Sequence, residues 1–304
     1  VRIIVRKARQ EGVSTLCEGL IFERTVRFEN TNSLIVAHEP ESTEAIFAMS
    51  KLFYDMLPVD VKPMRRYDNK RQMVFENPEE KSRTADPGLR SRMVIATADK
   101  VKIGRGLTLH NFHGSEVAFW KNAKELMLSV LQAIPNLPNT SVFLESTANG
   151  FGGDGEYFYK AVQDSLAGKN EFELIFLPWH LMPEYSRPFT GDKEKTTFSE
   201  TLDEYERDLK RKDKLTLEQL NWRRWAIQNK CGGDLEKFKQ EYPATIEEAF
   251  VASSRAVIPK QYIEAQAKFT RQPVRKLDDL LIYEEPNPRH FYSLGADPSE
   301  GIGQ

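Results

Sequence analysis

The sequence predicts an α/β fold in which a mostly parallel sheet is flanked by helices. Short runs of β-branched and aliphatic residues alternate with segments whose apolar residues recur at helical spacing. This alternation is typical of parallel sheets, because the chain must cross over, usually through a helix, before it starts the next strand. The expected strands are residues 2–5, 33–37, 92–97, 107–112, 140–144 and 172–177.

Helices are expected between these strands, at residues 14–28, 42–57, 123–134 and 158–166. Residues 58–90 interrupt the alternation with prolines, charges and one strand-like piece at 73–75. Prolines and charges in this pattern indicate a surface excursion with a hairpin.

The chain has 304 residues, enough for one large domain or two medium ones. Composition changes near Pro178, and residues 198–239 read as charged helices whose like-charge cluster at 207–214 indicates a solvated face. We expect a core at 1–180, a helical linker or subdomain at 181–285, and the truncated start of another domain at 286–304. The first residues read as the middle of a domain and the last residues as the middle of a loop, so we expect the chain to be part of something longer.

Charge and cysteine usage exclude several classes of protein. The net charge is -2, so any contact with nucleic acid must come from local patches. Two cysteines, Cys17 and Cys231, cannot build a disulfide framework and indicate a reducing compartment.

There is no apolar run long enough for a membrane span, no signal peptide and no zinc-ligand spacing. We interpret His110 and His113 as packing or surface residues.

The first strand leads into a turn with the layout of a nucleotide phosphate loop. In such loops the N–H groups at the start of a helix hold phosphates, and a hydroxyl reaches Mg²⁺. When Gly12 is aligned with the second glycine of the usual pattern, Ser14 takes the hydroxyl position and Val13 the lysine position. Lys7 stands where the first glycine is expected and can supply the missing charge, with Arg9 as a second candidate. The alternative is a surface turn that binds nothing.

The strand expected at 107–112 leads to a carboxylate. Motors with a phosphate loop need one strand-end group to hold Mg²⁺ and a glutamate to polarise the attacking water. Ser115 stands in the place expected of the first, usually an aspartate, and Glu116 in the place of the second. A serine can still hydrogen-bond the ion or its water.

The strand at 140–144 runs into a small polar turn, residues 146–150, with the sequence STANG. Hydroxyl and amide groups at the carboxyl end of such a strand can sense a γ-phosphate, since ligands bind at this edge of open α/β sheets. The candidates are Ser146, Thr147 and Asn149. A plain turn is the alternative.

These segments resemble, in order, the motifs of phage large terminases, the ATPases that package viral DNA. Residues 7–15 (KARQEGVST) resemble the deviant phosphate loop of that family, residues 115–120 (SEVAFW) a variant of its acidic strand end, and residues 146–150 its coupling motif. The resemblance extends over about residues 2–303, with weak stretches at 58–90 and 183–215.

The resemblance implies an additional-strand, RecA-like ATPase that uses ATP and Mg²⁺. It implies that Glu116 activates water, that Ser14 and Ser115 serve Mg²⁺, and that Arg105 acts as an arginine finger toward a neighbouring subunit. The implied nucleotide-binding residues are Lys7, Arg9, Gln10, Glu11, Gly12, Val13, Ser14 and Thr15. The implied partners are double-stranded DNA, a portal protein, a small terminase subunit and further copies of the chain in a pentameric ring, in the host cytoplasm and without a membrane.

Residues 292–298 (YSLGADP) resemble the first strand of an RNase H-like nuclease, in which Asp297 would begin a two-metal site. The partner acids are missing, so we expect no nuclease activity from this chain. Two other functions remain open. One is another nucleic-acid-stimulated ATPase, such as a helicase-like motor; the other is a degenerate assembly protein that does not hydrolyse ATP.

Overall fold

The computed structural model describes residues 1–99, 106, 108–252, 266, 269, 272–277, 280–285, 287–289 and 291. The chain divides into two compact units, Val1–Ser254 and Arg255–Gln304. In the second unit, β9 (Arg275–Leu277) and β10 (Leu280–Ile282) form an antiparallel pair. The sheet, the helices and the candidate site described below all belong to the first unit.

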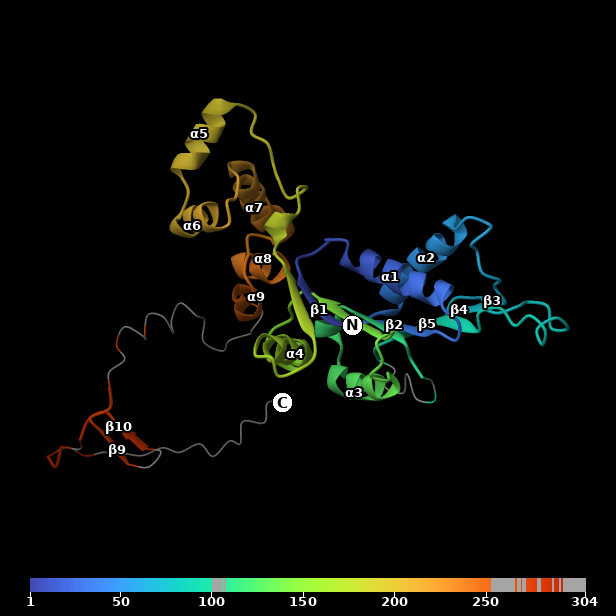
Figure 1. Ribbon diagram of the computed structural model, residues 1–304. Helices are drawn as coiled ribbons and strands as arrows, with labels where there is room; N and C mark the ends of the chain where they lie inside the picture. The colour runs from blue at the N-terminus through green and yellow to red at the C-terminus, as the bar shows by residue number, and fades with distance from the viewer. Residues whose placement is uncertain are drawn as a thin grey trace. The chain divides into compact units, whose positions relative to one another are not determined.

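An eight-stranded sheet is the centre of the first unit (Figure 1), in the order β3-β4-β5-β2-β6-β7-β1-β8. Six neighbouring strands of the sheet, β5, β2, β6, β7, β1 and β8, run parallel to one another. The other two, β3 and β4, extend the sheet as an antiparallel hairpin. The bounds are β1 (Arg2–Lys7), β2 (Asn32–Ala37), β3 (Tyr67–Asp68), β4 (Gln72–Phe75), β5 (Ser91–Thr97), β6 (Asn111–Ser115), β7 (Ser141–Ser146) and β8 (Glu173–Leu177). The α/β class and the hairpin within residues 58–90 are therefore confirmed.

One strand, β7, lies between β1 and β6 and pairs with both. It separates the strand that leads into the phosphate loop from the strand that leads to Glu116. This inserted strand is the feature that defines the predicted additional-strand arrangement, and it brings the ends of β1, β6 and β7 together at one edge of the sheet.

Helices cover both faces of the sheet (Figure 1). Alternate residues of the central strands point to opposite faces, as strand geometry requires. Ile35 and Phe143 pack with α1 (Val13–Arg27) and α2 (Pro40–Met56). Their neighbours along the strands pack on the other face with α3 (Ala123–Ala133), α4 (Glu156–Leu166) and α9 (Ile246–Ala252). The core thus consists of two apolar layers, one on each side of the sheet.

A further group of helices follows β8 and has its own apolar cluster. Its members are α5 (Asp192–Glu200), α6 (Glu204–Lys212), α7 (Leu217–Lys230) and α8 (Leu235–Glu241). Trp179, Tyr185 and Trp222 stack at the centre of this cluster, which also includes Ala8 of the phosphate loop. The outer face of α6 is solvated, as expected for its like-charge cluster. Short 3₁₀ turns complete the unit: η1 (Val117–Phe119), η2 (Gly153–Gly155) and η3 (Trp179–Leu181).

The strand expected at 107–112 is displaced toward the C-terminus, since the ladder of β6 runs from Asn111 to Ser115. The expectation followed the apolar residues upstream, whereas β6 itself contains buried polar residues. Asn111 can be buried because it hydrogen-bonds to Ser33 on β2 and Ser141 on β7. A polar ladder residue satisfied by its neighbours has no signature in the hydrophobic pattern. The part of the chain that the structure describes contains no helix that combines the length and the apolar character of a membrane span.

Candidate active site

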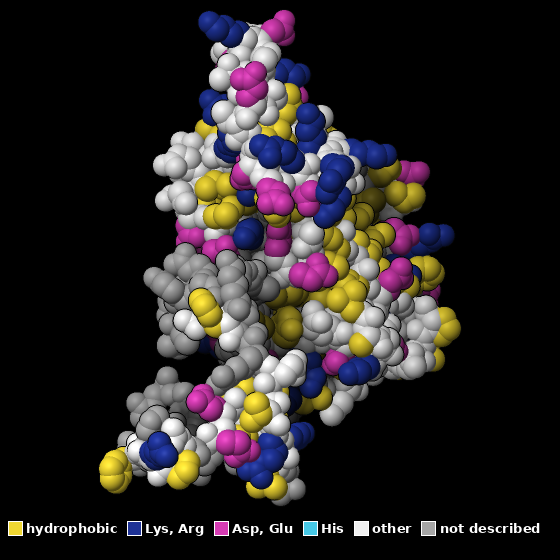
Figure 2. Space-filling view, turned by 90° about the vertical axis from the view of Figure 1, so that its left-hand side faces the viewer, with side chains coloured by type: hydrophobic (Ala, Val, Ile, Leu, Met, Phe, Trp, Pro, Cys, Tyr) yellow, Lys and Arg dark blue, Asp and Glu magenta, His cyan; other side chains and the backbone are white. Residues whose placement is uncertain are grey.

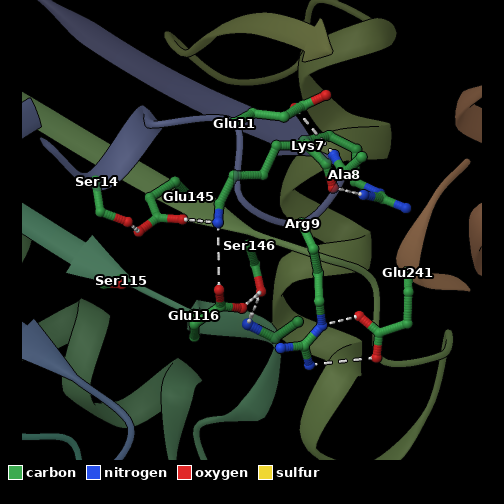
Figure 3. A network of polar contacts seen from close by, with 12 residues as sticks. Lys7, Ala8, Arg9, Glu11, Ser14, Ser115, Glu116, Glu145, Ser146 and Glu241 are labelled. Atoms are coloured by element: carbon green, nitrogen blue, oxygen red, sulfur yellow. Dashed lines mark hydrogen bonds and ion pairs between the residues drawn. The ribbon is translucent and has the colours of Figure 1, made fainter. Parts of the chain in front are cut away.

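The candidate site lies where β1, β6 and β7 end and α1 begins (Figure 3). In a parallel sheet all carboxyl ends lie at one edge, and the N-terminus of the following helix faces the same edge. The phosphate loop leaves β1, Ser115 and Glu116 end β6, and Glu145 and Ser146 end β7. Segments more than a hundred residues apart in sequence therefore form one polar cluster.

The phosphate loop turns into α1 at Gly12, which precedes the helix with a left-handed backbone, φ +71°. This conformation favours glycine, because a Cβ is strained there. Val13, in the usual lysine position, is buried against the apolar cluster under α1. Its side chain is therefore part of the core, and the positive charge of the site must come from another residue.

Lys7, at the start of the loop, brings a positive charge to the cluster at the strand ends. Its Nζ lies 3.0 Å from Glu145 Oε2 and 3.3 Å from Glu116 Oε1, and only 7% of its side chain is exposed. Burial on its own lowers the pKa of Lys7, but the two carboxylates outweigh burial and raise the pKa. Lys7 is therefore a charged ammonium held between the ends of β6 and β7.

Arg9, the second candidate for the charge, is engaged elsewhere. Its guanidinium pairs with Glu241 at the end of α8, and the hydrogen bond to Glu241 raises the pKa of Arg9. The backbone of Arg9 is also tied to the helical group, since its N–H donates to Glu241 O and its carbonyl accepts from Tyr185 Oη. Arg9 thus fastens the phosphate loop to α8.

The remaining loop residues have different surroundings. Glu11 accepts a hydrogen bond from the Ala8 N–H, and burial raises the pKa of Glu11 to about 7. Gln10 has a left-handed backbone, φ 55°. Thr15 is exposed and its hydroxyl lies 3.5 Å from the Met49 sulfur on α2. Of the two hydroxyl residues at the start of α1, only Ser14 therefore contacts the carboxylate cluster.

Glu116 follows β6 directly and has a left-handed backbone, φ 55° and ψ 46°. Such a backbone is uncommon for a residue other than glycine and is found preferentially at functional sites. The Glu116 carboxylate meets Lys7 through one oxygen and Ser146 Oγ, at 3.3 Å, through the other. Its side chain is 26% exposed, so water can reach it.

Glu145 is the main residue that sequence reasoning missed. It is fully buried, accepts a 2.7 Å hydrogen bond from Ser14 Oγ, and pairs with Lys7. Burial raises the pKa of Glu145, but Lys7, His113 and a hydrogen bond from Ser115 outweigh burial and hold the pKa well below its usual range. The signal was present in the sequence, because a carboxylate in an apolar, buried strand requires charged or hydrogen-bonding partners.

His113 and Glu18 extend this buried network from Glu145. His113 Nδ1 lies 2.6 Å from Glu18 Oε1, and its Nε2 lies 3.5 Å from Glu145 Oε1, an ion-pair distance. Burial on its own lowers the pKa of His113, but hydrogen bonds and charges from the two glutamates raise it to about 9. The imidazole is therefore charged at neutral pH. The interpretation of His113 as a packing or surface residue was incomplete, because it lies between two buried carboxylates.

The predicted coupling segment connects the site to the helices. Besides contacting Glu116, Ser146 Oγ accepts from the Ala118 N–H, and the Asn149 side chain donates to Ala118 O. Thr147 is buried. Gln240 of α8 donates to the backbone of Ala148 in the same segment. The end of α8 therefore contacts both the phosphate loop and the coupling segment.

Two predicted site residues, Arg105 and Asp297, lie outside the described residues, and so does the strand expected around residues 292–298. Among the described residues, no group of three or more His, Cys, Asp and Glu side chains forms a metal-binding cluster. Magnesium bound with a nucleotide needs fewer protein ligands than that, because phosphates and water fill most of its coordination sphere.

Comparisons with known proteins identify solved structures with a similar fold. No family model and no curated protein matches the chain. Among solved structures, the large terminase of bacteriophage HK97 aligns with 91% of this chain at a TM-score of 0.50 and 14% identity. The chain has the fold of a phage large terminase. The alignment covers 52% of the HK97 protein, so this chain spans about half its length.

Two further large-terminase structures align with lower scores. The ATPase domain from Thermus phage P74-26 has a TM-score of 0.45 at 17% identity, covering 82% of this chain and 88% of that domain. The large terminase of a thermophilic bacteriophage, solved in complex with ADP, has a TM-score of 0.42 at 11% identity. That alignment covers 66% of this chain and 45% of the thermophilic phage protein.

Proposed function

We propose that this chain is the ATP-hydrolysing part of a viral large terminase, and that hydrolysis drives double-stranded DNA into a procapsid. One observation carries the proposal. A lysine at the start of a phosphate loop, a hydroxyl at the start of α1 and two strand-end carboxylates meet within hydrogen-bonding or ion-pair distance. Phosphoryl transfer needs these groups, because its catalysis consists of positioning and charge stabilisation.

The proposed roles follow from where each side chain lies. Lys7 and the N–H groups at the start of α1 hold the phosphates of ATP, and Ser14 reaches the Mg²⁺ that accompanies them. Glu116, the more exposed carboxylate, orients the attacking water. Ser146, Thr147 and Asn149 transmit the change at the phosphate to the helical group.

The charges around Lys7 favour a magnesium complex over the free nucleotide as the substrate. Lys7 faces two carboxylates, so this trio has a net negative charge. A nucleotide without a cation would bring further negative charge to the same place, which is unfavourable at these distances. We therefore propose ATP with Mg²⁺ as substrate.

The proposed partners follow from the likeness to large terminases. They are double-stranded DNA, a portal protein, a small terminase subunit and further copies of this chain, in the cytoplasm of an infected cell. Arg105 is proposed to act on the ATP of the neighbouring copy. The net charge of -2 requires local surfaces to contact DNA.

ATP hydrolysis by the chain, with DNA and Mg²⁺, tests the proposal. We expect Glu116→Gln to lower kcat about 100-fold or more, because general-base catalysis is lost. Lys7→Ala should weaken ATP binding about tenfold or more, as expected for a lost charge-assisted contact. Arg9→Ala should have a smaller effect, since Arg9 is bound to Glu241. A wild-type rate no higher than that of Glu116→Gln would leave the non-hydrolysing assembly protein as the better description.

A further inference from the structure

The carboxylate usually found next to the catalytic glutamate is missing from β6, where Ser115 stands in its place. The structure contains a carboxylate directly beside that position. Glu145 on β7 is the register partner of Ser115 on β6, and it is equally the register partner of Val5 on β1. It therefore lies at the centre of the three strands that converge on the site.

The contacts of Glu145 are those that a magnesium-holding carboxylate would have. Its Oε1 accepts the hydrogen bond from Ser14 Oγ at 2.7 Å, and its Oε2 lies 3.0 Å from Lys7 Nζ (Figure 3). In phosphate-loop ATPases the loop hydroxyl and a strand-end carboxylate hold Mg²⁺ together. Ser14 and Glu145 already form such a hydroxyl–carboxylate pair.

We propose that Glu145 is the carboxylate that holds magnesium with the nucleotide, replacing the acid that β6 lacks at Ser115. The inference rests on the proposed function, because it assigns a residue to the same ATP site. The inference assigns different roles to Glu145 and Glu116. Glu145, fully buried and bonded to Ser14, serves the metal, and Glu116, partly exposed, serves the water.

The surrounding network is suited to this role. His113 lies at ion-pair distance from Glu145 and pairs with Glu18 of α1, which also accepts a hydrogen bond from Ser50 of α2. Such partners of a metal-binding side chain fix its orientation. We assign His113 and Glu18 as positioning residues, since neither contacts Ser14 or Lys7 in any described interaction.

Binding of ADP by the full chain, with and without Mg²⁺, tests the assignment. We would titrate ADP calorimetrically at Mg²⁺ concentrations from micromolar to millimolar and in EDTA. The wild type should bind ADP more tightly when Mg²⁺ is present. Glu145→Gln should need about tenfold or more Mg²⁺ for the same gain, in the range expected when a metal site is impaired. Glu206→Gln is the matched control and should retain the wild-type Mg²⁺ dependence, because Glu206 is a buried carboxylate that pairs with Arg223 and Arg224 outside the site. Glu18→Gln should shift the Mg²⁺ dependence in the same direction as Glu145→Gln but less, as expected for a positioning residue.

A second variant protects the test from a folding defect. The double variant Ser115→Asp/Glu145→Gln removes the carboxylate from β7 and places one at the neighbouring position on β6. We expect it to regain the wild-type Mg²⁺ dependence of ADP binding. Failure of this double variant to restore the dependence, in a chain that melts like the wild type, would count against the inference.

Two other outcomes overturn the assignment. If Glu145→Gln weakens ADP binding equally in Mg²⁺ and EDTA, Glu145 only anchors Lys7. If it leaves the Mg²⁺ dependence unchanged, another group holds the metal. Both outcomes differ from failure of the proposed function, in which the wild type would hydrolyse ATP no faster than Glu116→Gln or would bind no ADP under any condition.

Discussion

Lys7 and Arg9 are two nearby cations of the same loop, but their side chains have different partners. Both were candidates for the charge at the phosphates. The Lys7 ammonium is buried between two carboxylates at the strand ends, whereas 55% of the Arg9 side chain is exposed and its head group pairs with Glu241. A lysine suits the first place because it is a compact point charge, and an arginine suits the second because its planar group can contact both carboxylate oxygens.

Glu11 leads to a prediction about pH. Burial raises the pKa of Glu11 to about 7, so the carboxyl is largely protonated just below neutrality. An ionised Glu11 would repel bound phosphates, and the bound state therefore favours the protonated form. By linkage, nucleotide affinity should fall as pH rises through about 7, by at most about tenfold between pH 6 and 8.

Glu11→Gln should lack this component of the pH dependence. ADP binding to both proteins, measured at fixed saturating Mg²⁺, checks the prediction, because ionisation of the nucleotide itself is common to both titrations. Parallel pH profiles would show that Glu11 does not face the bound phosphates.

At the scale of the elements, the coupling segment packs closely against Gly155 at the end of η2. A Cβ added to Gly155 would lie 2.0 Å from Asn149 O and 2.9 Å from Gly150 O, both backbone atoms. The turn that carries Asn149 therefore has to shift if residue 155 gains a side chain. We expect Gly155→Ala to lower the free energy of unfolding by about 2 kcal/mol, as overpacking does, and to reduce ATP hydrolysis.

Gly152→Ala is the matched control for this prediction. Gly152 has an extended backbone, φ -132°, and a Cβ added there would meet no atom within 4 Å. The expected change in the free energy of unfolding is below about 0.5 kcal/mol. Chemical denaturation and ATPase rates of the two variants provide the comparison, and equal effects would mean that the turn tolerates displacement.

The end of α8 is the element that connects the site with the helical group. It contacts the phosphate loop through Arg9 and the coupling segment through Ala148. Arg6 of β1 is fully buried beside it, with its guanidinium 5.6 Å from the Phe250 ring centre and 3.5 Å from Gln240 O. Both loops are therefore in direct contact with the end of α8.

At the scale of the whole molecule, the net charge of -2 means that DNA phosphates would have to bind to local basic surfaces. Lys and Arg side chains mingle with Asp and Glu on the face shown in Figure 2. Basic residues of the 58–90 excursion are partly paired within the chain, for example Arg66 with Glu76 and Arg65 with Asp68. These two arginines are thus paired within the chain, and a ring of copies would present the other basic residues of the excursion together.

The proposed ring can be tested by mixing subunits. If neighbouring copies act on each other's ATP, Glu116→Gln subunits added to wild type at constant total protein should reduce DNA-stimulated hydrolysis more steeply than in proportion to their share. Arg105→Ala subunits should behave in the same way. A decrease strictly proportional to the wild-type fraction would mean that each copy works alone.

Local patterns in the sequence were enough to predict the fold class, and they also indicated several candidate residues of the site. The spacing of apolar residues indicated that strands and helices alternate. The turns that follow the strands indicated Lys7, Ser14 and Glu116 as candidates, because these motifs are short segments of the chain. The displaced strand β6 is the exception, since its polar residues are satisfied by partners on β2 and β7 that lie far away in sequence.

The order of the strands, and with it the set of residues that meet at the candidate site, became known from the three-dimensional structure. Glu145 becomes part of it because β7 inserts between β1 and β6, which places residue 145 beside Ser115 and within reach of Lys7 and Ser14. His113 and Glu18 acquire their charged partners in the same way, from different elements. A buried carboxylate in a strand needs a partner, but which partner it finds depends on long-range packing that no local pattern encodes.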